Sequence, residues 1–406
     1  MSYCTLTPTL IFDWNFLLSL SAATVVHPSG FSSSSLWDSV VQGRSGLKRN
    51  NLGWCDLTCW LGAIPGLDDV RLPSDLNAWE CRNHRLAWLA LQDTFFRRTV
   101  ATAVARHGSH RIGLVLGTST SGTRQTEIAY SRRHETGEWP EDFNYRRSHS
   151  ADTLCRFTAE VLGLQGPMSV ISTACSSSAK VFLTAQRWIN AGLIDAAIVG
   201  GVDSLCLSTL HGFDALQLLS ENVCRPFDAA RKGLSIGEAA GFVLLDKNPA
   251  PVYFAGGGES SDAWHMSTPH PEGQGAKDSM HQALRAARIQ SSDIGYVNAH
   301  GTATPANDRS EAAALTSVFG EYGVPVSSTK GITGHTLGAA GIVEAIVTAQ
   351  ALEHQILPPA ANLLLPDPAF KLDLVIKAKP ALFRYAMSNN FGFGGSNCTL
   401  VFGKSD

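Results

Sequence analysis

The sequence lacks a strong excess of charge of either sign. Its 406 residues carry 32 lysines and arginines against 35 aspartates and glutamates, for a formal net charge of −3. Nucleic acids and anionic membrane surfaces attract proteins with a marked positive charge, so the composition predicts neither nucleic acid nor membrane as a partner. The length and the 44% content of hydrophobic residues are typical of a compact enzyme with a large buried core.

Hydrophobic runs long enough to cross a bilayer are also lacking. The best candidate, residues 9–26, is interrupted by Asp13 and Asn15 and lacks the basic region of a signal peptide. A first strand with its connection fits this segment better than a signal peptide or a membrane helix. We therefore expect a cytoplasmic protein.

Clusters of cysteine are lacking as well. Of the nine cysteines, only Cys55 and Cys59 lie close together, and no neighbouring cysteine or histidine completes a set of four zinc ligands. An odd number of scattered cysteines predicts free thiols in a reducing compartment instead of a disulfide framework. We expect no metal site.

Short apolar runs alternate with alanine-rich segments along the chain. Nearly continuous apolar runs suit strands that are covered on both faces, and the alanine-rich segments have helical length and propensity. This alternation predicts a layered α/β fold. The expected strands lie at 111–117, 168–172, 196–201 and 241–245, and the expected helices at 179–191 and 339–352.

One pattern occurs twice. In residues 170–175, and again in 326–330, an apolar strand ends in a reactive residue and leads toward a helix. Between these segments, residues 246–251 contain two prolines, which break regular structure. We predict two similar halves, residues 1–247 and 252–406.

Cys175 is the first candidate for chemistry. It lies between an apolar strand and a helix, where the N–H groups and the dipole of the helix N-terminus favour a thiolate. Its small neighbours leave room for a substrate to reach the sulfur. For a cysteine taken alone, a buried structural role is the usual alternative.

Two histidines stand in segments suited to a polar ligand. His300 follows a short apolar strand, and Thr302 and Thr304 offer hydroxyl groups just after it. Lys330 and His335 flank a glycine-bearing turn that opens a helix, and glycine permits close backbone approach. The alternatives are ordinary hydrogen-bonded histidines and a phosphate-binding loop, but the residue order that a P-loop requires is missing.

A glycine-rich segment, residues 389–397, stands near the C-terminus. Its three glycines surround two aromatics, which suits a tight loop that presents backbone N–H groups to a developing oxyanion. Taken alone, a glycine-rich hairpin with packed phenylalanines is the alternative.

Together, these segments resemble the β-ketoacyl-acyl carrier protein synthase family, the elongating condensing enzymes of the thiolase superfamily. The resemblance covers most of the chain and also includes residues 43–46, 225–228 and 237–241. It implies a five-layered α-β-α-β-α thiolase-like fold, with the nucleophilic cysteine in the first half and the catalytic histidines in the second. Residues 168–172 would then form the strand that pairs across a dimer axis.

The resemblance also implies a role for each residue of the site. In this family, two backbone N–H groups form an oxyanion hole beside the nucleophile, and threonines contact the pantetheine arm of the substrate. The implied site contains the acyl-accepting Cys175, the catalytic His300 and His335, Lys330 with Glu311 as the acid that holds it, the gating Phe393, and the substrate-binding Thr302, Thr304, Phe391 and Gly394.

The implied reaction is a decarboxylative Claisen condensation. Malonyl-acyl carrier protein loses carbon dioxide, and the enolate attacks an acyl group on Cys175, which lengthens the chain by two carbons. Two neutral histidines donate Nε2–H to the enolate, and no cofactor is required. The pair of His300 and His335 favours elongation, because initiating synthases usually carry histidine with asparagine, and thiolases use a second cysteine as base.

Three alternatives stay open to different degrees. The residues after Cys175 depart from the housekeeping fatty-acid enzymes, which leaves a specialised synthase of polyene or polyketide chains open. A thiolase acting on coenzyme A thioesters would need a second catalytic cysteine near Gly394, and its absence argues against that function. A chain-length-factor subunit typically lacks the nucleophile, whereas Cys175 and both histidines are present here. Both a homodimer and a heterodimer with a related subunit remain open.

Acyl carrier protein is the expected partner. Carrier proteins are acidic, so a local basic patch should matter more than the total charge. A solvated, partly mobile loop is the alternative explanation for the arginine cluster ahead of Cys175. That cluster consists of Arg124, Arg132, Arg133, Arg146 and Arg147.

Overall fold

A computed structural model describes residues 17–406 of the chain. It contains one 11-stranded sheet, in the order β13-β11-β10-β15-β16-β9-β1-β8-β6-β4-β5. The strand expected within residues 9–26 is β1, and the part of that segment before residue 17 lies outside the described residues. The strands are β1 (Leu18–Val26), β4 (Ile112–Gly117), β5 (Met168–Ile171), β6 (Ala196–Asp203), β8 (Ala239–Asp246), β9 (Val252–Ser261), β10 (Ile294–Asn298), β11 (Pro325–Ser327), β13 (Asp373–Leu374), β15 (Tyr385–Gly392) and β16 (Ser396–Lys404).

Two sets of strands repeat one arrangement within this sheet. Numbered along its own part of the chain, each set has the order third, second, fourth, fifth, first: β5-β4-β6-β8-β1 and β11-β10-β15-β16-β9. In both sets the second strand pairs in parallel with the third and the fourth, and the fifth runs antiparallel to its neighbours. The first strands, β1 and β9, meet only where Leu18 pairs with Phe254 and Ser19 with Tyr253. We call the two sets the N-terminal and the C-terminal half sheet.

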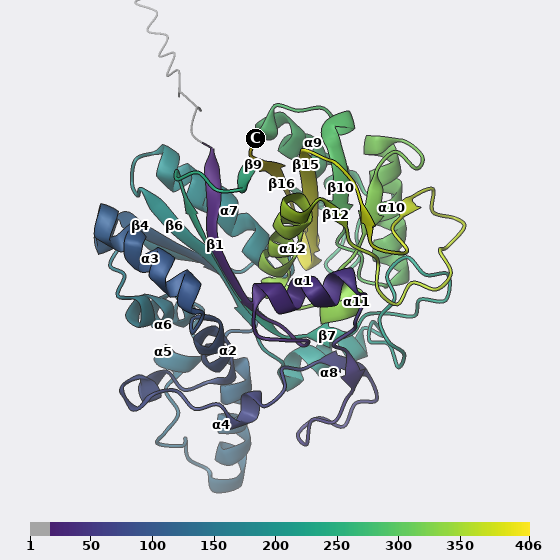
Figure 1. The fold of residues 1–406 in the computed structure, drawn as a ribbon. Helices are drawn as coiled ribbons and strands as arrows, with labels where there is room; N and C mark the ends of the chain where they lie inside the picture. The colour runs from purple at the N-terminus through teal and green to yellow at the C-terminus, as the bar shows by residue number, and fades with distance from the viewer. Residues whose placement is uncertain (1–16) are drawn as a thin grey trace, which may run out of the picture.

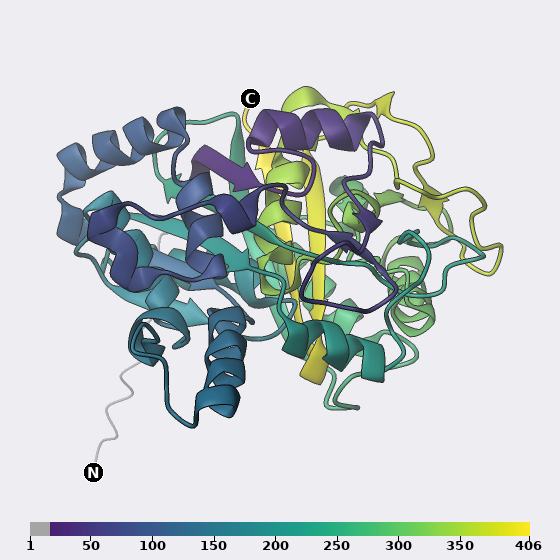
Figure 2. The ribbon, with the colours of Figure 1, turned by 90° about the horizontal axis from the view of Figure 1, so that it is seen from below.

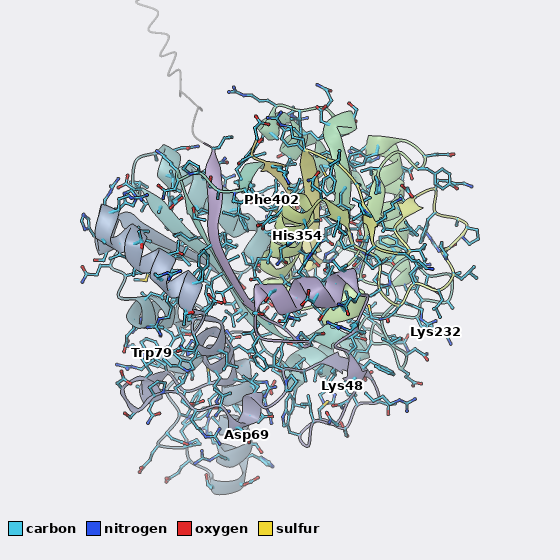
Figure 3. All side chains as sticks on the ribbon, viewed as in Figure 1. Lys48, Asp69, Trp79, Lys232, His354 and Phe402 are labelled. Atoms are coloured by element: carbon cyan, nitrogen blue, oxygen red, sulfur yellow. The ribbon has the colours of Figure 1, made fainter. Side chains whose placement is uncertain are left out.

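Helices cover both faces of each half sheet (Figures 1 and 2), which confirms the five-layered α-β-α-β-α fold. The helices α7 and α12 lie between the half sheets and share one central core with both; Phe402, labelled in Figure 3, belongs to that core. Two further cores lie on the outer faces. The layers contain α7 (Ser177–Asn190) and α12 (Ala340–His354) in the centre, α2 (Arg82–Ala90), α3 (Thr94–His107) and α6 (Thr153–Leu162) outside the N-terminal half sheet, and α9 (Gln274–Ala287) and α10 (Pro305–Phe319) outside the C-terminal one.

The central strands are apolar on both faces. Successive side chains of a strand point to opposite sides, so in β6 Ala197 and Val199 face the central core, whereas Ala196 and Ile198 face the outer one. Because helices cover both sides, both sets of positions must be hydrophobic. This explains why the sequence shows continuous apolar runs where an exposed sheet would alternate.

Shorter elements connect these layers. The helix expected at 339–352 begins at Ala340, after a single 3₁₀ turn, and ends at His354. The connecting elements are α1 (Ser33–Val41), α4 (Thr123–Thr136), α5 (Tyr145–Ser148), α8 (Leu207–Ala215), α11 (Lys330–Thr333), β2 (Lys48–Arg49), β3 (Trp60–Gly62), β7 (Ile236–Gly237), β12 (Ile356–Leu357) and β14 (Lys379–Pro380).

Within residues 17–406, no helix combines the length and the apolar character that crossing a bilayer requires.

Candidate active site

Cys175 lies on the short connection between β5 and α7, at the N-terminal end of that helix. The residue before it, Ala174, has a φ of 51°, a left-handed conformation that non-glycine residues rarely adopt. Only 5% of Cys175 is exposed. Burial raises the pKa of its thiol to about 12, although Lys330 and the backbone N–H of Phe393 act in the opposite direction.

His335 approaches Cys175 from the other half of the molecule. It follows α11 through Gly334, whose φ of 71° lies in the left-handed region, and its backbone N–H donates to Ser235 O at 2.7 Å. Its Nε2 lies 2.9 Å from Cys175 Sγ. Burial, followed by the charge of Lys330, lowers the pKa of His335 well below its ordinary value. The ring is therefore neutral where it meets the thiol.

His300 follows β10 and stands beside His335, with the ring centroids 5.3 Å apart and the planes at 87°. Lys330 Nζ lies 3.2 Å from His300 Nδ1. An ammonium group can only donate, so Nδ1 accepts and the proton of the neutral ring sits on Nε2. Burial lowers the pKa of His300 well below its ordinary value, and Lys330 and His335 lower it further. His300 thus offers a neutral Nε2–H donor.

Glu344, and not Glu311, is the carboxylate that holds Lys330. Lys330 is 1% exposed and forms an ion pair with Glu344, which stands on α12. Asn390 Nδ2 donates to the same carboxylate, and burial raises the pKa of Glu344. The role expected for Glu311 is wrong in this respect, because the packing of α12 over Lys330 is a tertiary contact that no local pattern shows.

Glu311, on α10, binds the backbone of the His300 loop instead. Its carboxylate accepts from His300 N at 2.8 Å and from Gly301 N at 2.7 Å. Burial raises the pKa of Glu311 to about 7. Glu311 therefore fixes the loop that carries the histidine, whereas Glu344 neutralises the lysine.

The expected catalytic and substrate-binding residues come together around one pocket of about 150 Å³. One ligand atom each of Cys175, His300 and His335 lies within 4.8 Å of the others. Lys330 and Glu311 contact His300 without lining the pocket. Its other expected lining residues are Thr302, Thr304, Phe391, Phe393 and Gly394.

One cysteine and two histidines are also ligands that Zn²⁺ prefers. Here, however, the buried ammonium of Lys330 lies 3.2 Å from His300 Nδ1 and would repel a divalent cation. The nearby Glu344 carboxylate is bound to that ammonium, and Glu311 to backbone N–H groups. The donor set fits a nucleophile with two neutral imidazoles better than a metal centre.

A second pocket, of about 330 Å³, also reaches Cys175. Both pockets are lined by Phe213 and Phe393, whose rings stack with centroids 5.3 Å apart at 28°. The sequence had not indicated Phe213 or Ser119, although the polar run 118–121 directly after a buried strand was a usable signal. The lining consists of Ser119, Ala174, Cys175, Ser208, Thr209, Gly212, Phe213, Leu216, Leu337 and Phe393.

Four of the five arginines expected to bind a carrier protein make side-chain contacts within the chain. Several lie over tryptophan rings, and others pair with carboxylates. Their docking role stays a prediction. Arg124 pairs with Glu127 and lies over Trp54, Arg132 pairs with Asp142, Arg133 lies over Trp139, and Arg147 lies over Trp79.

Comparison with known sequences gives a consistent result. Residues 82–250 match the family described as β-ketoacyl synthase, N-terminal domain, and residues 253–364 match β-ketoacyl synthase, C-terminal domain. The chain is 32% identical to a 3-oxoacyl-[acyl-carrier-protein] synthase 2 of Vibrio cholerae, over 93% of this chain and 96% of the relative. It is 35% identical to nodulation protein E of Rhizobium meliloti, over 72% of this chain and 75% of the relative.

Solved structures show the same similarity. A chain of the complex between a ketosynthase and its chain length factor from Xenorhabdus doucetiae superposes with a TM-score of 0.87 and 38% identity, over 96% of this chain and 98% of that chain. A chain of the ishigamide ketosynthase/chain length factor gives a TM-score of 0.86 and 25% identity, over 96% and 100%.

Proposed function

Because the chain belongs to the β-ketoacyl synthase family, we propose that it is a condensing acyltransferase that extends acyl chains by two carbons. It joins a malonyl unit, delivered on an acyl carrier protein, to an acyl group held on Cys175. The observation that carries this assignment is the 2.9 Å contact between Cys175 Sγ and His335 Nε2, beside a neutral His300 whose Nδ1 faces Lys330.

Acyl transfer starts from a thiol that does not ionise by itself near neutral pH, because burial raises its pKa to about 12. His335 Nε2 accepts the thiol proton while the sulfur attacks the acyl thioester, and backbone N–H groups stabilise the oxyanion. The Phe393 N–H already reaches the sulfur. The bond from the acyl carbon to the carrier's sulfur breaks, the proton passes to the departing pantetheine thiolate, and the acyl group stays on Cys175.

Condensation uses His300, whereas His335, expected from the resemblance as a second donor to the enolate, acts in acyl transfer in this proposal. Malonyl-carrier protein enters the pocket lined by Thr302 and Thr304, and loss of carbon dioxide leaves an enolate whose oxygen accepts the Nε2–H of His300. Lys330, bound to Nδ1, holds His300 in this tautomer. The enolate carbon attacks the acyl carbonyl, the bond to Cys175 Sγ breaks, and the released thiolate takes up a proton from solvent. The β-ketoacyl product leaves on the carrier.

The alternatives fit the site less well. A thiolase would place a second cysteine by the substrate, but in the described part of the chain Cys175 is the only cysteine that lines either pocket. A chain length factor typically lacks the nucleophile, whereas this chain has Cys175 with both histidines in contact distance. The acyl chain that it elongates belongs to a fatty acid, a polyene or a polyketide.

We further propose that the chain acts as a dimer, either with itself or with a related subunit. The ketosynthase of Xenorhabdus doucetiae forms a complex with its chain length factor, and the similarity covers nearly the whole chain. β5, the strand predicted at the dimer axis, ends the sheet, and its Met168 is 46% exposed. Such an edge offers unpaired backbone groups to a partner strand. The cytoplasmic location and the division at residues 247–252 stay predictions.

Mass spectrometry of the acylated enzyme tests the assignment. Cys175→Ala should abolish acyl-enzyme formation from acyl-carrier protein, with the chain assayed alone and with a co-expressed related subunit. Cys155→Ala is the matched control, because Cys155 is also buried and has a pKa raised to about 12, but lies on α6. Acyl label on any other cysteine would refute the proposal.

A further inference from the structure

Asp203, at the end of β6, is a fully buried carboxylate that the reaction above does not use. Its donors are hydroxyl and backbone N–H groups. Such a dense set of donors holds a carboxylate in one orientation. The six donors are Thr118 Oγ1, Ser119 N and Oγ, Thr120 N and Oγ1, and Gly338 N.

These donors belong to two separate walls of the site. Ser119 stands on the connection after β4 and lines the second pocket beside Cys175. Gly338 stands three residues after His335, and its N–H donates to Asp203 at 2.6 Å. A Cβ on Gly338 would lie 2.7 Å from Asp203 Oδ2 and 2.9 Å from Ser119 N. The walls therefore meet at the carboxylate without room for a further side chain.

The C-terminal half contains the same device. After β10, its second strand, the consecutive N–H groups of His300 and Gly301 donate to the buried carboxylate of Glu311. After β4, the second strand of the N-terminal half, the consecutive N–H groups of Ser119 and Thr120 donate to Asp203, both at 2.8 Å. One carboxylate thus fixes each loop that enters the site.

We propose that Asp203 is a positioning residue. It fixes the connection at Ser119, which lines the second pocket beside Cys175, against the turn that follows His335, and so determines which acyl groups fit on Cys175. The proposal rests on the acyl-transfer function assigned above. Asp203 acts through Ser119 and Gly338 and does not line either pocket.

The charge of Asp203 gives a second readout. A nearby anion opposes formation of a thiolate, and Asp203 contributes in this way to the raised pKa of Cys175, after the larger effect of burial. Removing the charge should therefore lower the pKa of the thiol. A role confined to folding would leave this titration unchanged.

Asp203→Asn tests both effects. Asparagine keeps one acceptor oxygen but turns an NH₂ group toward the N–H of Gly338 or of Ser119, so the two walls separate. We expect a roughly 10- to 100-fold loss of kcat/KM for acyl transfer, a changed preference in a panel of acyl chain lengths, and alkylation of Cys175 by iodoacetamide at lower pH. Asp203→Glu keeps the charge, so it should alter the acyl preference but keep the alkylation profile of the wild type.

Asp246→Asn is the matched control. Asp246 is a buried carboxylate on the neighbouring strand β8, at the opposite end from Asp203, and accepts from Ser21 Oγ and Asn248 N. This variant should melt earlier at most, with the wild-type acyl preference and alkylation profile. Wild-type behaviour of Asp203→Asn in both readouts would overturn the proposal.

A variant at an exposed position covers the case in which Asp203→Asn does not fold. Ser119→Ala removes one donor to Asp203 and should change the acyl preference several-fold without a change in melting temperature. An unchanged preference would contradict the positioning role. These outcomes differ from failure of the proposed function, in which the wild-type Cys175 itself would take up no acyl label.

Discussion

β5 and β11 hold equivalent places in the two half sheets, and each leads into the active site. From β5 the chain passes through Cys175 into α7, and from β11 it passes through Lys330 and His335 toward α12. The two helices pack together, with Ile342 N of α12 donating to Ser178 Oγ of α7 at 3.0 Å. Both junctions therefore open at one point, although in the proposed reaction one supplies a nucleophile and the other supplies a cation and a neutral base.

The loops after β4 and β10 also share one arrangement and differ in the residues that they bring to the site. Each donates two consecutive N–H groups to a buried carboxylate, Asp203 in one half and Glu311 in the other. Only the C-terminal loop carries a histidine, whereas in the N-terminal loop Ser119 lines the second pocket. In the proposed reaction the two halves divide the work: the first holds the acyl group, and the second prepares the carbanion.

Replacement of His300 should give the largest effect and test this division directly. Without its Nε2–H donor, His300→Ala should lose roughly 10²- to 10⁴-fold in decarboxylation of malonyl-carrier protein. Acylation of Cys175 should change only a few-fold, because His335 and not His300 contacts the sulfur. Carbon dioxide release and mass spectrometry of Cys175 measure the two steps separately.

Ser119→Ala, in the corresponding N-terminal loop, is the control. It should affect the choice of acyl group and leave decarboxylation unchanged. If His300→Ala slowed both steps equally, the two halves would not divide the reaction as proposed.

The two buried glutamates of the C-terminal half should differ in their effect on stability. Glu344→Gln leaves the Lys330 ammonium buried without its counter-charge and should lower the free energy of unfolding by about 3 kcal/mol. Glu311→Gln changes an acceptor of two backbone N–H groups and should cost about 1–2 kcal/mol at pH 7. Urea denaturation followed by circular dichroism measures both variants.

The Glu311 variant should also show a characteristic pH dependence. Burial raises the pKa of Glu311 from 4.5 to about 7, so between these values the folded protein binds more protons than the unfolded chain. The contribution of Glu311 to stability is then largest below pH 4.5 and falls as the pH rises through 7. Glutamine does not titrate, so the stability of the wild type relative to Glu311→Gln should fall from pH 5 to pH 8. A constant difference would contradict the raised pKa.

Most of the frame could be predicted from the sequence because its signals are local. Apolar runs predicted β4, β5, β6 and β8, and the junctions at Cys175 and Lys330 stood out as reactive residues between a strand and a helix. The partner of Lys330 could not be predicted, because Glu344 reaches it only through the packing of α12. Asp203 was missed for the same reason: its donors at 118–120 lie on another strand's loop and become neighbours only when β4 and β6 pair.

Charge reversal on α4 should give the smallest effect and test whether carrier binding belongs to the N-terminal half. Arg132→Glu with Arg133→Glu should slow acyl transfer from carrier protein several-fold at low salt, because association with an acidic partner depends on surface charge. The effect should vanish near 1 M salt, where charges are screened within about 3 Å. The fold should tolerate the change, since the ion pair of Arg132 with Asp142 is exposed and such pairs contribute little to stability.

The matched control is Arg285→Glu with Arg288→Glu, a pair of exposed arginines at the end of α9 in the C-terminal half. Equal losses in both double variants would reflect total charge, and an unchanged rate in the α4 variant would remove this surface as the docking site.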